Sequence, residues 1–169
     1  MTDNVFAGIT CAFTGYRPEK LPWGSNENDM RCQKLKEHIY DVVCALYESG
    51  IRRFICGMAR GCDTYFCEAV FSLREEHDDV HIEAAIPCPQ QSHSWTAPDR
   101  KRYNRLVSEC DECTVIDSEY TPECMLKRNR YMVDKASVLL AVFDGKKGGT
   151  AATVSYAQSL DREVIVVNP

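Results

Sequence analysis

Short apolar runs alternate along the whole chain with segments of helical periodicity. Six of these runs are too short for buried helices and are rich in β-branched and aromatic residues, so they predict buried strands. The runs are 9–13, 54–56, 82–86, 113–117, 138–143 and 163–168. Because the runs are almost continuously apolar, the pattern predicts a sheet that is covered on both faces.

The segments between these runs carry apolar residues three and four positions apart, which predicts helices. The clearest stripe follows the first strand, where Leu35, Ile39, Val43 and Leu46 share one face and Gly50 is placed to end the helix. Strict alternation of strand and helix predicts a mainly parallel sheet between two layers of helices. We expect one three-layer α/β domain that takes in residues 1–169.

Polar, glycine and basic residues follow four of the predicted strands. They are Thr14, Gly15 and Arg17 after the first, Gly57, Arg60, Gly61 and Asp63 after the second, Asp117 and Tyr120 after the fourth, and Asp144, Gly145, Gly148, Gly149 and Thr150 after the fifth. In such sheets ligands bind beyond the carboxyl ends of the strands. The glycine turn after the fifth strand opens a helix whose free N–H groups suit a phosphate. The alternative is a tight strand-to-helix turn without a ligand.

Three arginines favour the phosphate interpretation. Arg17, Arg60 and Arg128 are expected beside two helix starts in a protein of net charge −5. Local positive charge in an acidic protein favours a small anionic ligand, so a small phosphorylated partner is expected and nucleic acid is not. Structural roles stay open, because Arg17 could form an ion pair, Arg60 could cap its turn, and Asp63 could cap its helix instead of accepting from ribose.

Composition adds constraints on location and metal binding. The apolar fraction is 44%, and no apolar run approaches the roughly 18 residues of a membrane span. The N-terminus does not resemble a signal peptide, and most of the ten cysteines stand at apolar-patterned positions, so we expect a reduced, cytoplasmic protein with no membrane contact. Cys110 and Cys113 form a lone CxxC and the four histidines lack ligand spacing, so no metal site is expected.

Two aromatic residues in loops are candidates for contact with a base. Trp95 lies in the irregular stretch 87–98, where it could close over a ligand and stack on its base, or else plug the core. Tyr120 follows the fourth strand and is the second stacking candidate.

Three motifs together resemble the YpsA-like family of the SLOG superfamily. They are TGYRPEKL at 14–21, GMARGCD at 57–63 and RNRYMVDKASVLLAVFDGKKGGTAATVSYA at 128–157. The resemblance implies a bacterial or phage protein with a Rossmann-like fold, related to the LOG phosphoribohydrolases and the DNA-processing protein DprA. It also implies a nucleotide or nucleotide-derivative ligand, with NAD and ADP-ribose among the candidates, and it allows self-association.

A comparison with LOG-type enzymes limits the catalytic expectation. Those enzymes carry an arginine before the glycine strand and a PGGxGTxxE turn, whose glutamate acts on the ribose. Arg128 matches the arginine and Gly148-Gly149-Thr150 the end of the turn, but Thr153 stands where the resemblance places the glutamate. Threonine cannot supply a carboxylate, so we expect nucleotide binding in a sensing or regulatory role.

Two other functions stay open. One is an enzyme that cleaves an N-glycosidic or phosphoribosyl bond with a carboxylate from elsewhere, for which Asp63, Glu68, Asp134 and Asp144 are candidates. The other is a scaffold or regulatory interaction protein whose pocket is vestigial.

Overall fold

The computed structural model describes residues 6–169 and contains one open sheet of six parallel strands in the order β4-β3-β2-β1-β5-β6. The strands are β1 (Thr10–Gly15), β2 (Arg53–Cys56), β3 (His81–Ile86), β4 (Glu112–Val115), β5 (Val138–Val142) and β6 (Glu163–Val167). The α-helices are α1 (Met30–Glu48), α2 (Cys62–Glu76), α3 (Ala97–Glu109), α4 (Cys124–Asp134) and α5 (Gly149–Ser159), and η1 (Ala7–Ile9) and η2 (Pro18–Lys20) are short 3-10 helices. The expected Rossmann-like α/β fold is confirmed.

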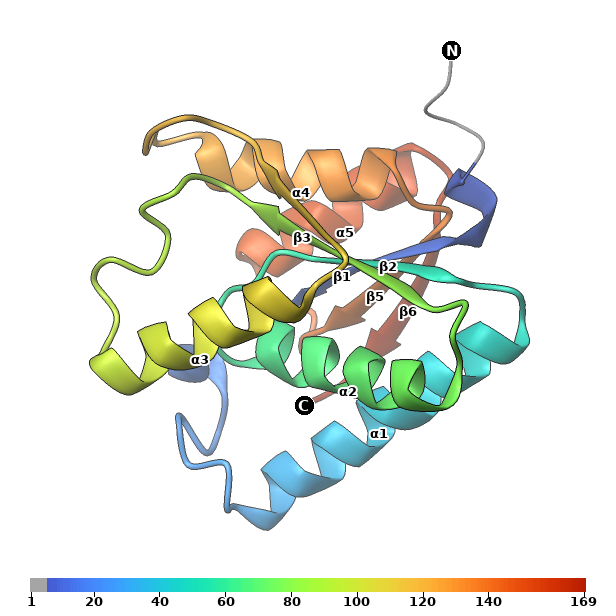
Figure 1. Ribbon diagram of the computed structural model, residues 1–169, viewed down its shortest axis with the longest axis horizontal. Coiled ribbons are helices and arrows are strands. Elements are labelled where there is room, and N and C mark those ends of the chain that lie inside the picture. The colour runs from blue at the N-terminus through green and yellow to red at the C-terminus, as the bar shows by residue number, and fades with distance from the viewer. Residues whose placement is uncertain (1–5) are drawn as a thin grey trace.

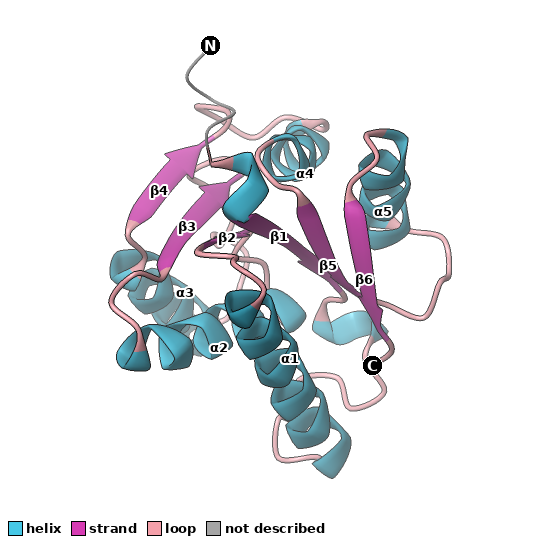
Figure 2. Cartoon of the chain, turned by 90° about the vertical axis from the view of Figure 1, so that its right-hand side faces the viewer, coloured by secondary structure: helices cyan, strands magenta, loops and turns pink. Residues whose placement is uncertain are grey.

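The helices form two layers because the chain changes direction across the sheet. From β1 to β4 each strand is added on the same side of its predecessor, and the right-handed crossovers place α1, α2 and α3 on one face. The chain then returns to the other side of β1 for β5 and β6, which places α4 and α5 on the opposite face (Figures 1 and 2). The strand order therefore reverses between β1 and β5, the position at which open α/β sheets bind ligands.

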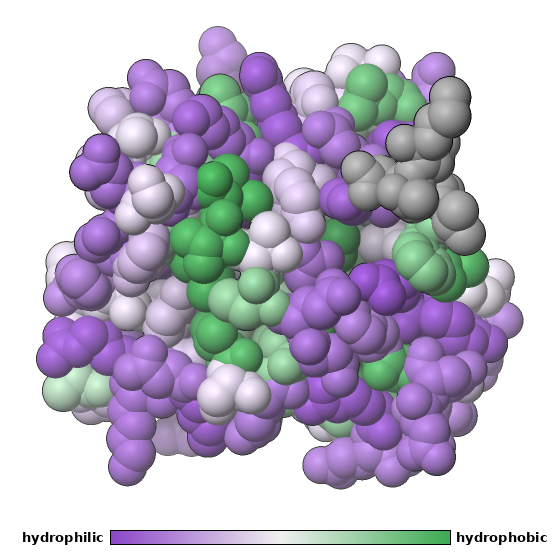
Figure 3. All heavy atoms as spheres, turned by 45° about the horizontal axis from the view of Figure 1, so that its top comes forward, coloured by the Kyte–Doolittle hydropathy of each residue, from purple (hydrophilic) through white to green (hydrophobic). Residues whose placement is uncertain are grey.

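The core lies around β1, β2 and β5. Phe13 of β1 stacks on Phe66 of α2 with ring centroids 4.4 Å apart, and Phe54 meets the same ring edge-on. All five residues of β5 are buried, as their continuous apolar pattern predicts. The face drawn in Figure 3 is mostly hydrophilic, with a band of hydrophobic side chains left of its centre and smaller hydrophobic patches elsewhere.

The sequence pattern was wrong about the two strands at the sheet edges. We expected every strand to be covered on both faces, but β4 exposes most of its residues, and Val115 is 47% exposed. It also ends two residues before the predicted boundary. β6 is only partly covered, and Val166 is 54% exposed. A strand at the edge of a sheet has a neighbouring strand on one side only, so part of it stays exposed to solvent even when its sequence is apolar.

Prolines lie close to the starts of two helices. Thr96 caps α3 by accepting the N–H of Asp99, so that helix starts at Ala97, next to Pro98. α4 starts at Cys124, two residues after Pro122. In residues 6–169 there is no helix whose length and hydropathy would allow it to cross a bilayer.

Candidate functional site

A cleft of about 360 Å³ lies at the carboxyl edge of the sheet, where the strand order reverses. Its walls come from the end of β1, the η2 turn, the starts of α2 and α5, and α4. The predicted site residues that line it are Thr14, Gly15, Arg17, Asp63, Arg128, Gly149 and Thr150. All three sequence motifs therefore contribute to one cavity, as expected for strand ends on either side of β1.

The start of α5 is open to this cleft. The N–H groups of Gly149, Thr150 and Ala151 donate to no acceptor within the described chain. A β-carbon built on Gly149 would meet no atom within 4 Å, so a ligand can approach the backbone closely here. Three free N–H groups at the positive end of a helix dipole form a seat for an anion.

The start of α2 is more occupied than the start of α5. The N–H of Cys62 donates to the Tyr16 carbonyl at 3.1 Å, and Thr64 and Tyr65 donate to Gly61. The turn after β1 therefore packs directly on the start of α2, and the α5 start offers an anion more free N–H groups.

Two cations face the cleft beside the α5 start. Lys20 places its Nζ next to Gly148, the N-cap of α5, and 5.3 Å from the centre of the Tyr16 ring. Arg17 also lines the cleft, and neither side chain pairs with a carboxylate within residues 6–169. Lys20 is absent from the sequence-based set, although it stands three residues after Arg17 in the same motif.

Arg60 does not join these cations. Its guanidinium pairs with Glu19 and lies 5.8 Å from the centre of the Trp95 ring, on the wall of a second cavity. Its partner Glu19 does line the cleft. In this structure Arg60 is paired with Glu19 beside the second cavity, and its contact with a phosphate stays a prediction.

Arg128 lies at the bottom of the cleft, and its side chain is buried, with only 4% of the residue exposed. Its Nη1 donates to the carbonyls of Gly57 and Ala85 and to the side chain of Gln91, and its Nε donates to Asn129. Burial lowers the pKa of the guanidinium, although neighbouring Asp63 raises it. Most of its donors are bound to the protein itself, so the geometry gives Arg128 a structural role under the cleft and not that of a free phosphate ligand.

Three of the predicted glycines are required for packing. A β-carbon on Gly57 would lie 2.6 Å from Cζ of Arg128, and one on Gly15 would lie 2.7 Å from Cβ of Cys62. Gly61 has φ +83° and packs against the Tyr16 carbonyl. Gly57 and Gly61 do not line the cleft. These two glycines therefore bring β2, α2 and the turn after β1 together, whereas Ala59 and Asp63 of the same motif line the cleft.

The side chain of Asp144 links the turn after β5 to the turn after β1. Its carboxylate accepts hydrogen bonds from the Tyr16 hydroxyl and from the N–H of Lys146, and Lys146 Nζ pairs with it at 3.0 Å. Neither Asp144 nor Gly145 lines the cleft. Its oxygens hold the turn after β5 against the turn after β1, and the expectation that Asp144 accepts from a ribose stays a prediction.

This link should titrate in acid. The hydrogen bond from Tyr16 lowers the pKa of Asp144 from 3.8 to about 2. A depressed carboxyl pKa means that the stabilisation is complete above pH about 4 and is lost as the pH falls through about 2. Carboxyl ¹³C NMR should give a midpoint near 2 for Asp144, and a higher midpoint in Tyr16→Phe. A wild-type midpoint close to 4 would show that the link does not form in solution.

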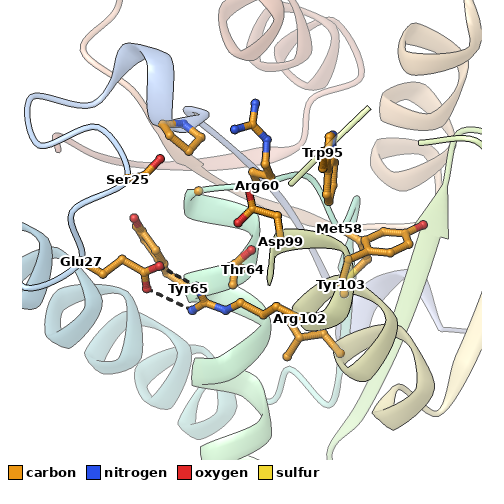
Figure 4. A pocket seen from close by; sticks show the side chains of 13 residues that line it. Ser25, Glu27, Met58, Arg60, Thr64, Tyr65, Trp95, Asp99, Arg102 and Tyr103 are labelled. Atoms are coloured by element: carbon orange, nitrogen blue, oxygen red, sulfur yellow. Dashed lines mark hydrogen bonds and ion pairs between the residues drawn. The ribbon is translucent and has the colours of Figure 1, made fainter. Parts of the chain in front are cut away.

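Trp95 belongs to the second cavity, of about 70 Å³, which Figure 4 shows. It meets Tyr103 edge-on with ring centroids 5.2 Å apart. On the other side of this cavity Arg102 donates to Glu27 of the loop before α1 (Figure 4). Arg102 also donates to Glu68 of α2. Trp95 therefore packs on α3 outside the main cleft. Tyr120 is 65% exposed and lines neither of these cavities.

Comparisons with known proteins agree with this architecture. The chain is 31% identical over 138 residues to an SPbeta prophage-derived protein of Bacillus subtilis, YoqJ, an alignment that covers 74% of this chain and 81% of YoqJ. It is 25% identical over 141 residues to the UPF0398 protein YpsA of the same organism, covering 82% of this chain and 78% of YpsA.

Solved structures of DprA share the fold. DprA from Streptococcus pneumoniae superposes with a TM-score of 0.63 at 13% identity, covering 94% of this chain and 50% of that one. DprA from Helicobacter pylori, described for its single-stranded DNA binding mode, gives a TM-score of 0.63 at 16% identity, covering 95% and 65%. The chain thus spans between half and two thirds of these DprA chains.

These neighbours correct one expectation about partners. The net charge of −5 led us not to expect nucleic acid. That exclusion is wrong, because a protein with this fold is described as binding single-stranded DNA. Net charge sums over the whole surface, whereas a binding face depends on local charge.

The family assignment rests on the whole length of the domain. A model of the YspA SLOG family matches residues 11–163, which include β1, the glycine turn and α5. The three motifs that suggested the resemblance all fall within or overlap this range. The chain therefore belongs to the YspA SLOG family.

Proposed function

We propose that this protein binds the phosphate of a nucleotide or nucleotide derivative at the start of α5. The observation that carries the proposal is the open α5 start with Lys20 beside it, on the wall of the 360 Å³ cleft. Hydrogen bonds to a charged group contribute about 1.5–3 kcal/mol each, and the helix dipole adds about 0.3–1 kcal/mol. These contributions favour a phosphate over a neutral ligand.

We infer a sensing or regulatory role in place of LOG-type hydrolysis. The hydroxyl of Thr153 donates to the Gly149 carbonyl at 3.0 Å and is buried within its own helix turn. No carboxylate stands at this position of α5. We also place the protein in the cytoplasm, which is supported by its ten cysteines, all of them free thiols.

A second candidate is a phosphate of single-stranded nucleic acid in the same seat. The fold shared with Helicobacter pylori DprA supports this candidate. A mononucleotide and a strand differ in salt dependence, because a strand brings several phosphates and releases more counterions on binding. The same titration with both ligands therefore separates the two candidates.

The test uses two variants of nearly equal size at one position. Gly149→Asp should weaken binding of AMP and of ribose 5-phosphate by at least about tenfold, since it places a like charge at the seat. Its folded state should be as stable as the wild type or more so, because an acidic residue in a first helical turn stabilises by about 0.3–1 kcal/mol. Gly149→Asn should lose much less affinity.

Isothermal titration calorimetry with AMP, ribose 5-phosphate, ADP-ribose and a short oligodeoxynucleotide measures these effects, and thermal unfolding measures stability. Equal affinity in Gly149→Asp and wild type would contradict phosphate binding at α5. No binding of any of these ligands at millimolar concentration would favour the scaffold function instead.

A further inference from the structure

Four acidic residues, Asp63, Glu68, Asp134 and Asp144, were named above as candidates for a catalytic carboxylate, and one of them lines the cleft. Glu68 is held by Arg102 and Arg105 near the second cavity. Asp134 accepts from the Tyr156 hydroxyl at 2.7 Å, and Asp144 holds the loop after β5. Asp63 alone of these four lies on the cleft wall.

One carboxylate oxygen of Asp63 has no partner in the described chain. Its side chain lies in the first turn of α2, where Oδ2 accepts the N–H of Ala59 at 2.9 Å, and the residue is 6% exposed. Its other oxygen, Oδ1, has no hydrogen-bond partner in the described chain and is not sealed from solvent. Gly61 is the N-cap of α2, so Asp63 does not serve as the cap. A nearly buried carboxylate oxygen without a partner in the chain, on a residue that lines a cavity, is available to accept a hydrogen bond from a ligand.

The position of Asp63 relative to the α5 start limits the ligand. β2 and β5 flank β1, so the helix starts that follow them, α2 with Asp63 and α5 with Gly149, approach the cleft from opposite sides of β1. The cleft therefore has a positive end at α5 and Lys20, and the free oxygen of Asp63 on the other side. Glu19, the second acidic residue on the cleft wall, is paired with Arg60. A second phosphate near Asp63 would be repelled, whereas hydroxyl groups could donate to Oδ1.

We propose that Asp63 recognises the sugar of the ligand, a pentose whose phosphate lies at the α5 start. Its carboxylate accepts hydrogen bonds from the vicinal hydroxyls of that pentose. This inference rests on the proposed function and narrows the ligand to ribose 5-phosphate and compounds that contain it. A 5-phosphorylated pentose carries both groups that the two sides of the cleft would bind, a phosphate and neighbouring hydroxyls. Ligands that lack the 2-hydroxyl leave Oδ1 partly unpaired and should bind more weakly.

The experiment compares ribose 5-phosphate, 2-deoxyribose 5-phosphate and inorganic phosphate by calorimetry. Wild type should bind ribose 5-phosphate about tenfold more tightly than the deoxy sugar, as expected for one hydrogen bond to a charged group. In Asp63→Asn this ratio should fall below about threefold, while affinity for inorganic phosphate is kept. Asp134→Asn, outside the cleft, should keep the wild-type ratio. AMP as a fourth ligand reports whether a base adds affinity to the pentose phosphate.

The outcomes separate this inference from the proposed function. If wild type binds ribose 5-phosphate and 2-deoxyribose 5-phosphate with equal affinity, the proposed role of Asp63 is wrong. If Gly149→Asp still weakens binding in that case, the proposal of phosphate binding at α5 stands. Failure of every phosphate ligand, inorganic phosphate included, overturns both. If Asp63→Asn does not fold, wild type is titrated with arabinose 5-phosphate, which inverts the 2-hydroxyl. Equal affinity for ribose and arabinose 5-phosphates would then reject the inference, and a preference for ribose would support it.

Discussion

Replacing Arg128 by methionine should lower the free energy of unfolding by about 3–5 kcal/mol, the range for removing one charge from a buried group of partners. Methionine fills a similar space but donates no hydrogen bond. The carbonyls of Gly57 and Ala85 would lose a donor, and Asp63 would lose the nearest buried positive charge. Urea denaturation monitored by tryptophan fluorescence measures the change.

Arg130→Met is the matched control for this prediction. Arg130 lies two residues away on the same helix, but it is exposed and lies over the Tyr156 ring at 5.3 Å. Its replacement should cost about 1 kcal/mol or less. If both variants unfold at the same urea concentration, Arg128 is not a structural residue. Loss of ligand binding in Arg128→Met would by itself say nothing about a phosphate contact, because the floor of the cleft would change as well.

Gly61→Ala should destabilise the protein by roughly 2–4 kcal/mol. Its φ of +83° is strained for alanine, which costs about 1–3 kcal/mol. The new β-carbon would also lie 2.8 Å from the Tyr16 carbonyl oxygen and 3.0 Å from Pro18 Cδ. Relief of that contact would push the turn after β1 away from α2 and break the hydrogen bond from Cys62 to Tyr16.

Gly145→Ala separates backbone strain from the steric contact. Gly145 has φ +87°, nearly the value at Gly61, but its β-carbon would meet no atom within 4 Å. It should therefore cost only the strain, about 1 kcal/mol. Thermal or urea unfolding of the two variants gives the difference. Equal destabilisation would mean that the contact between Gly61 and the turn after β1 carries no stability.

The fold was predictable because its strands are apolar runs separated by helical stripes. β5 is buried on both faces, and its continuous apolar run identifies it as a buried strand from the sequence alone. The exposure of β4 was not predictable, because its apolar residues cannot reveal that the strand has only one neighbour. Strand order depends on pairings between distant segments, which local patterns do not encode.

The site was predictable only in part for a similar reason. Strand ends on either side of β1 bring Thr14, Asp63 and Gly149 into one cleft, as the motifs indicate. The sequence could not tell which polar groups the protein uses for itself. Asp144 and Arg60 are held by Tyr16 and Glu19, partners that come from another loop. Lys20 reaches the cleft because η2 turns it toward the start of α5.

The central position of β1 determines when the cleft can form during synthesis. Cys11 pairs with Phe54 of β2 on one side and with Val138 of β5 on the other, so one neighbour leaves the ribosome long before the second. Until β5 is available, the nascent chain carries an apolar strand with one open edge, the kind of edge that pairs with other chains and attracts chaperones. The start of α5 follows β5 in the chain, so a chain truncated before β5 lacks the proposed phosphate seat and exposes an edge prone to aggregation.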